Sequence, residues 1–573
     1  MIPSLPPGVL MMFGAILLPL LGKKFSAIGA LVLSSISLIL FWTLPADHVI
    51  PMSFFGQELI LARIDKLSWI FCLVFHLAAI MASVYALHVK DTKQHVAAML
   101  YAGSSIMASC AGDMITLFVC WELTAVSSVF LIWASNSEKA YRSGMRYLII
   151  QVISGVLLLS GAIIRFRSTG DLGFHSFIDG DPSSFFTLSL GSKLILIAFG
   201  IKAAFPLLHN WLQDAYPKST PTGTVFLSAF TTKLAIYSLA RGFAGLEELV
   251  WIGCAMTLFP IVFAVIENDL RRVLAYSLNN QLGFMVVGIG IGSDLAINGT
   301  AAHAFCHIIY KALLFMSMGA VLKQVGTTKA TELGGLHKTM PWTTLFCIIG
   351  AGAISGFPLL SGFISKSMII SAAAYEHRFV VWFILLIASA GVMEHSGIKI
   401  PFFAFFAHDS GKRPKEAPLN MLIAMGMGAF LCVGLGVAYP LLYKNLPYEL
   451  HHEYVPYTLA HVVMQLQLLL FAGLAFLFLM KMGLYPEEKR STNLDFDWVY
   501  RKLFPNAISQ IGRGIRWMDQ TLRACVLWLL TWFVRICEKN FNETGNLGTT
   551  WSTSLMAFWA AILLGLCLML YYL

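Results

Sequence analysis

Long runs of apolar residues separated by short polar segments make up most of this sequence. Many of the runs reach about 17–25 residues, the length that an α-helix needs to cross the hydrocarbon core of a bilayer. The pattern predicts an all-α integral membrane protein with about sixteen spans. They cover residues 3–22, 25–43, 67–88, 95–111, 113–134, 145–164, 191–213, 221–243, 246–266, 273–292, 297–322, 340–373, 379–406, 418–442, 457–480 and 551–573.

The pattern changes between residues 484 and 550. The stretch YPEEKRSTNLDFDWVYRK is polar, and residues 507–542 mix Arg and Lys with Trp, Leu and Phe. Such mixing predicts an amphipathic helix that lies along the membrane or on a partner protein, interrupted by Pro505, Gly512 and Gly514. A short seventeenth span at 522–536 is the alternative.

One short motif occurs twice. Ala-Phe-Pro-Leu-Leu at 204–208 returns as Gly-Phe-Pro-Leu-Leu at 356–360, each time inside an apolar run. Proline breaks a helix and frees backbone carbonyls, which a membrane tolerates only where they line protein or water. Pro206 and Pro358 are therefore predicted helix breaks, and a matched pair of broken helices is typical of transporters built from repeats.

Composition supports the membrane assignment. Of 573 residues, 58% are hydrophobic and only 12% charged, about half the charge of a soluble globular chain. The net charge of +9 comes from basic residues scattered singly between apolar runs, which indicates topology-setting loops rather than a nucleic-acid surface. The N-terminal run lacks a preceding basic residue, and we interpret it as an uncleaved first span.

The basic residues also predict an orientation. With the N-terminus outside, the cytoplasmic loops would carry sixteen Lys and Arg residues and the opposite loops eight, which fits the positive-inside rule. The loops at 138–146 and 407–416 are then expected in the cytoplasm.

No motif indicates bound cofactors or hydrolytic chemistry. The ten cysteines contain no CxxC pair, and neither a phosphate-binding loop, a dinucleotide fingerprint nor a nucleophile motif occurs. We therefore predict no cofactor, no metal and no catalytic residue.

Four charged residues lie deep inside apolar runs: Glu122, Lys202, Lys233 and Lys366. An ionised group near the bilayer centre costs roughly 2.5–3.5 kcal/mol unless it is paired or hydrated. Snorkelling to an interface is unfavourable for groups ten or more residues from a window end, and a static ion pair would leave two lysines unexplained. These residues are therefore candidates for proton transfer.

His303, His307 and Lys311 follow at i, i+4 and i+8, along one helical face. Two histidines at this spacing can bind a metal, but HEXXH is absent and no acidic ligand lies nearby. Because imidazole accepts a proton on one nitrogen and donates from the other near neutral pH, a proton relay is the favoured interpretation. Glu394, with His395 and Lys399, could extend the line.

Several blocks resemble one known family. GIKAAFPLLHNWLQDAYPKSTPTGTVFLSAFTTKLAIYSLAR is similar to the signature of the antiporter-like subunits of respiratory complex I, membrane-bound hydrogenases and Mrp-type Na⁺/H⁺ antiporters. ENDLRRVLAYSLNNQLGF, HAFCHIIYKALLF and GFPLLSGFISK match further blocks in the same order, so the resemblance covers about residues 60–440. The amino-acid sequence of the first block is most similar to that of the D-type subunits of Mrp antiporters.

The resemblance implies a core of about fourteen helices built from two inverted five-helix repeats with broken helices. It implies that Glu122 and Lys202 form the charge pair of the first half and that Lys233 bridges toward the centre. His303, His307 and Lys311 would continue the axis, and Lys366 would end it. The motif does not place the partner of Lys366, and the tail resembles, in layout only, the lateral helix and final span of the largest complex I antiporter-like subunit.

Together these observations divide the chain into six parts. We expect N-terminal spans at 1–94, a first repeat with the proton channel at 95–243, a second repeat at 246–406, C-terminal spans at 407–483, a polar linker and lateral helix at 484–550, and a final span at 551–573.

The predicted function is that of a proton-translocating subunit of a multisubunit Na⁺/H⁺ antiporter in a bacterial or archaeal cell membrane. Its expected partners are other membrane subunits, H⁺, Na⁺ as the candidate exchanged ion, and lipid. The alternatives are a proton-pumping subunit of a redox-driven complex and, in a different class, a membrane scaffold that transports nothing.

Overall fold

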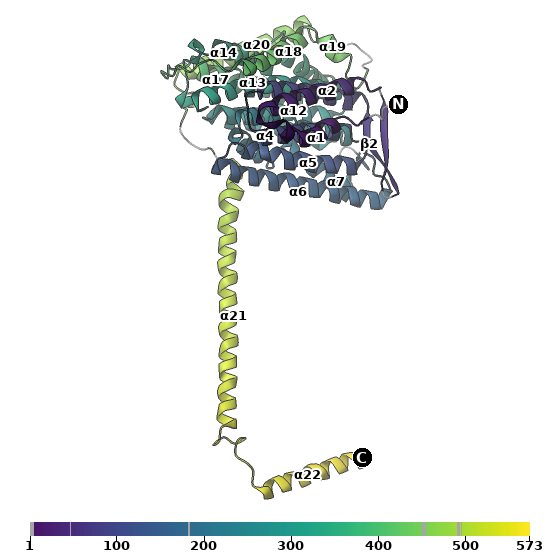
Figure 1. The fold of residues 1–573 in the computed structure, drawn as a ribbon, viewed down its shortest axis with the longest axis vertical. Coiled ribbons are helices and arrows are strands. Elements are labelled where there is room, and N and C mark those ends of the chain that lie inside the picture. Colours follow the sequence, from purple (N-terminus) through teal and green to yellow (C-terminus); the bar gives the residue numbers. More distant parts are fainter. Residues whose placement is uncertain are drawn as a thin grey trace. The chain divides into compact units, whose positions relative to one another are not determined.

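A computed structural model describes residues 5–45, 47–54, 56–181, 184–449, 454–486, 488–489, 493 and 495–573. The chain is 76% helical and divides into two compact units, residues 1–495 and 496–573. The prediction of a predominantly helical, multi-span membrane protein is confirmed. Figure 1 shows the helices of the first unit packed side by side, with strand β2 at one end of them.

The first unit holds most of the elements. Its α-helices are α1 Val9–Leu17, α2 Gly22–Trp42, α3 Lys66–Tyr85, α4 Thr92–Cys110, α5 Met114–Trp133, α6 Glu138–Thr169, α7 Leu190–Ala203, α8 Asn210–Ala215, α9 Pro221–Ala229, α10 Thr231–Gly242, α11 Glu247–Ile266, α12 Leu270–Ile291, α13 Asp294–Val325, α14 Pro341–Ser355, α15 Ser361–Tyr375, α16 Phe379–Val392, α17 Lys399–Pro401, α18 Leu419–Val437, α19 Tyr439–Tyr443 and α20 Leu459–Lys481. Short 3₁₀ turns are η1 Leu18–Leu21, η2 Phe185–Thr187, η3 Tyr216–Lys218, η4 Ala330–Glu332 and η5 Leu336–Lys338, and π-helical turns are η6 Met393–Ile398 and η7 Phe402–Phe406.

Twelve helical stretches in the described part of the chain are long and apolar enough to cross a membrane. Two predicted windows, 95–111 and 273–292, form α4 and α12 but fall outside this set because buried polar residues such as Asn279 and Asn280 interrupt their apolar character. The windows 191–213 and 340–373 are each divided into two shorter helices. The stretch Val9–Trp42 reverses direction at Gly22, since Gly14 of α1 lies against Leu33 of α2.

Contacts between loops sort the helix ends into two groups. Arg271 donates to the carbonyl oxygen of Pro217 at 2.9 Å, and Gln324 to that of Glu416 at 2.6 Å. We call this the basic end; it gathers the loops 86–91, 134–137, 216–220, 267–269, 326–340 and 407–418 and, after α20, residues 482–486, 488–489, 493 and 495. The opposite end gathers residues 111–113, 170–181, 184–189, 243–246, 292–293, 376–378, 438–449 and 454–458, as the ion pair of Arg378 with Glu247 at 2.7 Å indicates.

Close packing depends on glycine where α11 and α12 cross. A Cβ at Gly253 would lie 2.6 Å from the backbone nitrogen of Val287, and one at Gly283 would lie 2.7 Å from that of Thr257. Small residues let two helix backbones approach directly, which replaces the hydrophobic driving force that is missing inside a bilayer.

A β-hairpin amends the all-α prediction. Strands β1 His48–Phe54 and β2 Gln57–Ile64 pair antiparallel, with an irregularity at Ile50 and Pro51. Proline has no N–H to donate, so the ladder shifts there. The hairpin docks onto the opposite end, where the backbone N–H of Ile60 donates to Asp113 at 2.8 Å.

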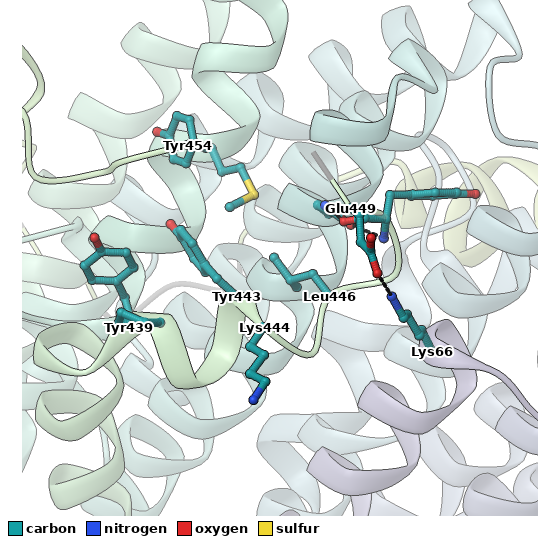
Figure 2. Close-up of a pocket in the computed structure, with 11 residues that line it drawn as sticks. Lys66, Tyr439, Tyr443, Lys444, Leu446, Glu449 and Tyr454 are labelled. Carbon is teal, nitrogen blue, oxygen red and sulfur yellow. Dashed lines mark hydrogen bonds and ion pairs between the residues drawn. The ribbon is translucent and has the colours of Figure 1, made fainter. Parts of the chain in front are cut away.

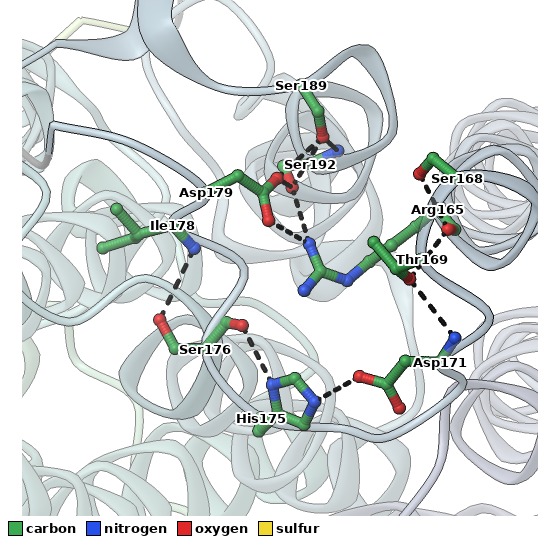
Figure 3. Close-up of polar contacts among 10 residues, drawn as sticks. All are labelled: Arg165, Ser168, Thr169, Asp171, His175, Ser176, Ile178, Asp179, Ser189 and Ser192. Atoms are coloured by element: carbon green, nitrogen blue, oxygen red, sulfur yellow. Dashed lines mark hydrogen bonds and ion pairs between the residues drawn. The ribbon is translucent and has the colours of Figure 1, made fainter.

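Figure 3 shows the polar contacts that tie the loop after α6 to the start of α7. Arg165 donates to Asp179 at 2.5 Å, and Ser192 and Ser189 donate to the other carboxylate oxygen at 2.6 and 2.8 Å. Burial by itself raises the pKa of Asp179, but the hydrogen bonds from these serines and from Arg165 outweigh it and hold the pKa below its ordinary value. The carboxylate is therefore ionised at neutral pH and fixes the loop.

The second unit contains the π-helical turn η8 Val499–Leu503, α21 Phe504–Phe541 and α22 Thr553–Tyr572. Figure 1 shows α21 as one continuous helix, so the predicted interruptions at Pro505, Gly512 and Gly514 are wrong. Pro505 lies in the first turn, where its missing N–H costs nothing, and single glycines weaken a helix without ending it. The stretch Val499–Phe541 also meets the criterion of length and composition for a span.

Candidate functional site

Two interrupted helices flank the core of the first unit. Helix α7 stops before Pro206 and resumes as α8, while α14 stops before Pro358 and resumes as α15. The backbone takes the same left-handed turns at positions 152 residues apart: φ is +61° at Ala204 and +78° at Gly356, and +72° at Leu207 and +71° at Leu359. The repeated motif of the sequence thus corresponds to a repeated local structure.

Lys202 lies in the last turn of α7, directly before the first interruption, and is fully buried. Its ammonium donates to the carbonyl oxygen of Trp121 at 2.6 Å and to the hydroxyl of Thr124 at 3.1 Å. The ammonium also lies 4.2 Å from the centre of the Trp121 ring, a favourable cation–π contact.

Glu122 on α5 lies next to this lysine and interacts with it electrostatically. Among the described residues no ion pair within 4.0 Å joins them, and the Oε1 atom of Glu122 is buried without a hydrogen-bond partner. Glycine at 155 makes room for the carboxylate, because a Cβ there would lie 1.4 Å from Oε1. The two groups are neighbours with separate contacts, not a closed salt bridge.

Lys233 lies just beyond a further helix break, between α9 and α10 at Phe230. Its buried ammonium donates to the carbonyl oxygen of Ser228 at 2.6 Å. The hydroxyl of Tyr101 accepts from the backbone N–H of Thr231 at 2.9 Å, which satisfies the new helix start.

Helix α13 carries the predicted histidine face. His303, His307 and Lys311 are all fully buried, and the two imidazole centres lie 6.1 Å apart. The Nδ1 atom of His303 shares a hydrogen bond of 3.0 Å with the hydroxyl of Ser365 on α15, and the hydroxyl of Tyr310 lies 3.5 Å from its Nε2 atom.

His307 and Lys311, like the Oε1 atom of Glu122, carry unsatisfied polar atoms. Both ring nitrogens of His307 and the ammonium nitrogen of Lys311 are buried without a hydrogen-bond partner among the described residues. An unsatisfied buried polar group costs about 1–3 kcal/mol, and more when it is charged. A fold retains such groups at that cost only where they serve another purpose or meet water.

Lys366, on α15, ends the line that the sequence proposed. Its ammonium donates to the carbonyl oxygen of Ile354 at 2.8 Å, close to where α14 stops, and lies 5.4 Å from the centre of the Phe284 ring. The partner that the sequence left unplaced is thus, in part, a backbone carbonyl at the second interruption.

The segment after α16 adds three ionisable groups, Glu394 and His395 in the π-helical turn η6 and Lys399 at the start of α17. Glu394 is half-buried, and its Oε1 atom has no hydrogen-bond partner within the described part of the chain. His395 is fully buried, and its Nδ1 atom contacts the hydroxyl of Ser396 at 2.9 Å. Lys399 is fully buried and pairs with Glu488 at 2.8 Å.

Electrostatic interactions connect most of the ionisable groups of the second half with one another. Lys233 interacts with His307, Lys366 with His303 and His395, and Lys399 with His395. Within the described residues no hydrogen bond or ion pair joins Lys202 to Lys233. The site therefore consists of a pair in the first half and a longer group in the second half.

The sequence did not reveal several residues of this arrangement. Tyr310 and Ser365 contact the histidines, Gly155 accommodates Glu122, and Glu488 pairs with Lys399. Tyr310 lies on the histidine helix face and could have been noticed from its spacing. Glu488 lies in a polar linker far from the motif blocks, so no sequence signal pointed to it.

The metal interpretation of the histidines finds no support in geometry. No group of three or more His, Cys, Asp or Glu side chains that could hold a metal is found in the part of the chain that the structure describes. The polar contacts of His303 are the hydroxyls of Ser365 and Tyr310 instead.

Two surface hollows lie at opposite ends of the second half. One, of about 510 Å³, lies at the end away from the basic end. Figure 2 shows Tyr439, Tyr443, Tyr454 and Lys444 around it. Figure 2 also shows Glu449 paired with Lys66, at a distance of 3.0 Å. The other, of about 390 Å³, lies at the basic end and is lined by His408, Thr331, Tyr485 and Glu488 among others.

Comparison with known proteins identifies the family. Residues 111–393 match the family described as NADH:quinone oxidoreductase/Mrp antiporter, TM, and the chain belongs to this family of antiporter-like membrane subunits, which is found in bacterial and archaeal membranes. The resemblance that the motif blocks carry is thereby confirmed.

Individual relatives cover different parts of the chain. The D-type subunit of a Na⁺/H⁺ antiporter of Alkalihalophilus pseudofirmus is 30% identical over 307 residues, which make up 52% of this chain and 62% of the relative. Hydrogenase-4 component B of Escherichia coli is 27% identical over 435 residues, 68% of this chain and 64% of the relative. The chain thus spans somewhat less than two thirds of these relatives.

Among solved structures, a chain of the membrane-bound sulfane sulfur reductase, an archaeal respiratory membrane complex, superposes with a TM-score of 0.72 at 21% identity. The match covers 99% of this chain and 100% of that chain. The two chains therefore share a fold.

Proposed function

We propose that this chain moves protons across the membrane as a subunit of a multisubunit Na⁺/H⁺ antiporter. The observation that carries the proposal is the set of buried ionisable groups beside two matching helix interruptions, above all His307 and Lys311, which have no hydrogen-bond partner among the described residues. The most economical role for such costly groups is to exchange protons with water and with each other.

The two halves are proposed to be inverted five-helix repeats, residues 95–243 and 246–406, within a core of about fourteen helices. The matching left-handed turns around Pro206 and Pro358 support this division, since each repeat would contribute one broken helix. Each interruption lies close to a buried lysine, Lys202 in the first half and Lys366 in the second.

Proton movement follows from electrostatic coupling along the line. A proton that arrives on one buried group favours release of the proton from a neighbouring lysine or histidine, because like charges repel strongly at low dielectric. We propose the order Glu122, Lys202, Lys233, then His307 and His303 with Lys311 and Lys366, and then Glu394 and Lys399. Water has to bridge the interval between Lys202 and Lys233.

The redox-driven alternative also has a supporting observation, because hydrogenase-4 component B is among the relatives. In that case another chain would supply the energy, and the residues of this chain would act in the same way. The experiment below separates the two possibilities from each other and from a scaffold.

The test uses inverted membrane vesicles from cells that make this chain together with its complete set of partner subunits. If the chain serves an antiporter, Na⁺ added to energised vesicles dissipates the pH gradient that a fluorescent amine reports. If it serves a redox pump, an electron donor builds a gradient and Na⁺ has no effect. If vesicles whose complex contains the Glu122→Gln variant give the same signal as wild-type vesicles, the remaining interpretation is that the chain is a scaffold.

The basic end is proposed to face the cytoplasm, with the N-terminus outside. To test this, exposed Cys525 and Cys567 and partly exposed Cys537 are first replaced by serine. A new cysteine at 139 or 413 should then react with a membrane-impermeant maleimide only in inverted vesicles. Reaction in intact cells would reverse the orientation.

The tail is proposed to clamp a partner subunit. Helix α21 has 38 residues and is about 57 Å long, roughly twice the thickness of a bilayer core, so it fits along the membrane better than across it. Truncation after residue 495 should remove partner subunits from an affinity pull-down through this chain. Full recovery of the partners would mean that the tail contacts only lipid.

A further inference from the structure

Glu488, which follows α20 in the chain, places its acidic side chain inside the basic end. The carboxylate of Glu488 lies 2.8 Å from the ammonium of Lys399, and the two side chains are only 8% and 0% exposed. A carboxylate is almost never buried unless it is paired, so the burial of Glu488 depends on its contact with Lys399.

Lys399 is held from the other side by the end of α11. Its ammonium donates to the carbonyl oxygens of Val265 and Glu267 at 2.6 and 2.8 Å, and to that of Ala264 at 3.3 Å. The last carbonyls of a helix have no partner within the helix, so the lysine satisfies them. These carbonyls fix the position of the ammonium, and Glu488 contacts it as an ion pair in which neither carboxylate oxygen accepts a hydrogen bond from a described residue.

Lys399 is also connected to the line of ionisable groups. His395 lies one turn earlier and interacts electrostatically with Lys399, Lys311 and Lys366. A proton on the histidine group therefore has Lys399 as a neighbour toward the basic end.

On its far side Glu488 reaches the surface. It lines the hollow of about 390 Å³ at the basic end, together with His408, Thr331 and Tyr485. A water molecule occupies about 30 Å³ in the liquid, so this space accommodates on the order of ten waters. Glu488 is thus the side chain that touches both the buried lysine and the hollow.

We propose that Glu488 is the proton-transfer residue that connects Lys399 with water at the basic end. The inference rests on the proposed function and adds to it a terminal group from outside the two repeats. The hollow at the opposite end offers no equivalent among the described residues, because its ion pair of Lys66 and Glu449 is exposed to solvent, with 53% and 91% of the side chains accessible.

The step is a simple proton exchange. An N–H bond of the Lys399 ammonium breaks while an O–H bond forms on Glu488, which leaves a neutral amine and a neutral carboxylic acid. The acid then releases the proton to water in the hollow and becomes a carboxylate again. The amine accepts the next proton from the direction of His395, and the cycle consumes no other reactant.

The surroundings suit this exchange. Burial raises the pKa of Glu488, while the charge of Lys399 opposes the rise without cancelling it. The other titratable groups nearby are Glu394, Glu267, Tyr485 and His408. Glu267 lies 3.3 Å from Arg272, its own ion-pair partner. Glu488 is the acidic group in direct contact with Lys399.

The first test compares Glu488→Gln and Glu488→Asp in vesicles that hold the whole complex. Glutamine has a similar size but no exchangeable carboxyl, so proton flux should fall by about tenfold or more. Aspartate keeps the charge and hence the contact that supports folding, and its lower intrinsic pKa should move the acidic limb of the pH–rate profile. Wild-type flux with glutamine, or an unchanged profile with aspartate, would overturn the inference.

The second test is chemical rescue. In Glu488→Ala, formate or acetate supplied from the side of the basic end should restore flux, with an efficiency that follows the pKa of the acid, whereas chloride should not. A carboxylate that only anchors the loop would give no such dependence. Absence of rescue at normal protein abundance would therefore argue for an anchoring role and against transfer.

Two controls separate this inference from the function on which it rests. Glu138 forms an exposed ion pair with Arg142 at the same end, so Glu138→Gln should leave flux unchanged. If wild-type vesicles show no flux that depends on Glu122, the proposed function fails. If that flux is present and Glu488→Gln matches wild type, only the assignment of Glu488 fails.

Discussion

Replacement of Glu122 by glutamine is expected to reduce coupled proton transport by about a hundredfold or more, at unchanged protein abundance. Glutamine preserves the size of the side chain but cannot ionise, so Lys202 loses the negative neighbour that favours its charged form. The measurement is pH-gradient formation or ion-driven dequenching in vesicles, with protein level determined by immunoblot.

Companion variants divide this effect into charge and position. Glu122→Asp should retain part of the activity, because the charge survives on a shorter arm. Glu122→Gln combined with Lys202→Met should insert normally, since no orphan charge remains, and still not transport. Gly155→Ala should impair transport severalfold, because the new Cβ would occupy the position of the carboxylate. Gly434→Ala faces open space and is the matched control.

Two outcomes would contradict this mechanism. If Glu122→Gln transports like wild type at equal abundance, the carboxylate is structural and the mechanism is wrong at its first step. If Gly155→Ala and Gly434→Ala behave alike, the contact between Glu122 and α6 has no part in transport.

Replacement of His307 is expected to slow proton movement about tenfold to a hundredfold, while thermal stability stays the same or rises. Both ring nitrogens of His307 lack hydrogen-bond partners among the described residues, so an apolar residue of similar size removes an unsatisfied group instead of a stabilising contact. His307→Leu is the cleanest variant, and His307→Ala adds a cavity. His303→Ala should have a similar or smaller effect, and the double variant should be inactive.

A buried histidine outside the line supplies the comparison. His76 contacts the hydroxyl of Ser37 at 2.9 Å and the carbonyl oxygen of Cys72 at 2.8 Å. His76→Leu should therefore lower the melting temperature and leave transport per molecule unchanged. Full transport by the His303 and His307 double variant would refute the relay, and bound zinc or nickel in the purified chain would restore the metal interpretation.

The helical membrane fold and the burial of Lys202 and Lys366 could be predicted because both depend on local cost. A bilayer admits continuous apolar helices, so span positions follow from runs of apolar residues alone. A charge inside such a run is expensive wherever it lies, which singled out Lys202 and Lys366 without structural knowledge. The prolines of the repeated motif mark interruptions for the same reason: they remove backbone hydrogen bonds within a single segment.

Contacts between segments were beyond the reach of this reasoning. The hairpin at residues 48–64, the uninterrupted course of α21 and the burial of Glu488 each depend on what packs against the segment, or on how many neighbours support it. Glycine within a long helix costs about 1 kcal/mol, which many favourable helical residues offset.

The sequence by itself determined that this chain is a helical membrane protein with ionisable groups at membrane depth, because hydrophobicity and helix breaking act on neighbouring residues. Only the tertiary structure decided which groups touch: that Lys202 binds a carbonyl beside Glu122 and that His307 has no partner among the described residues. It also placed a carboxylate from residue 488 against Lys399. Hydrogen bonds and ion pairs reach only about 3–4 Å, so they depend on distances between segments that no single stretch of sequence contains.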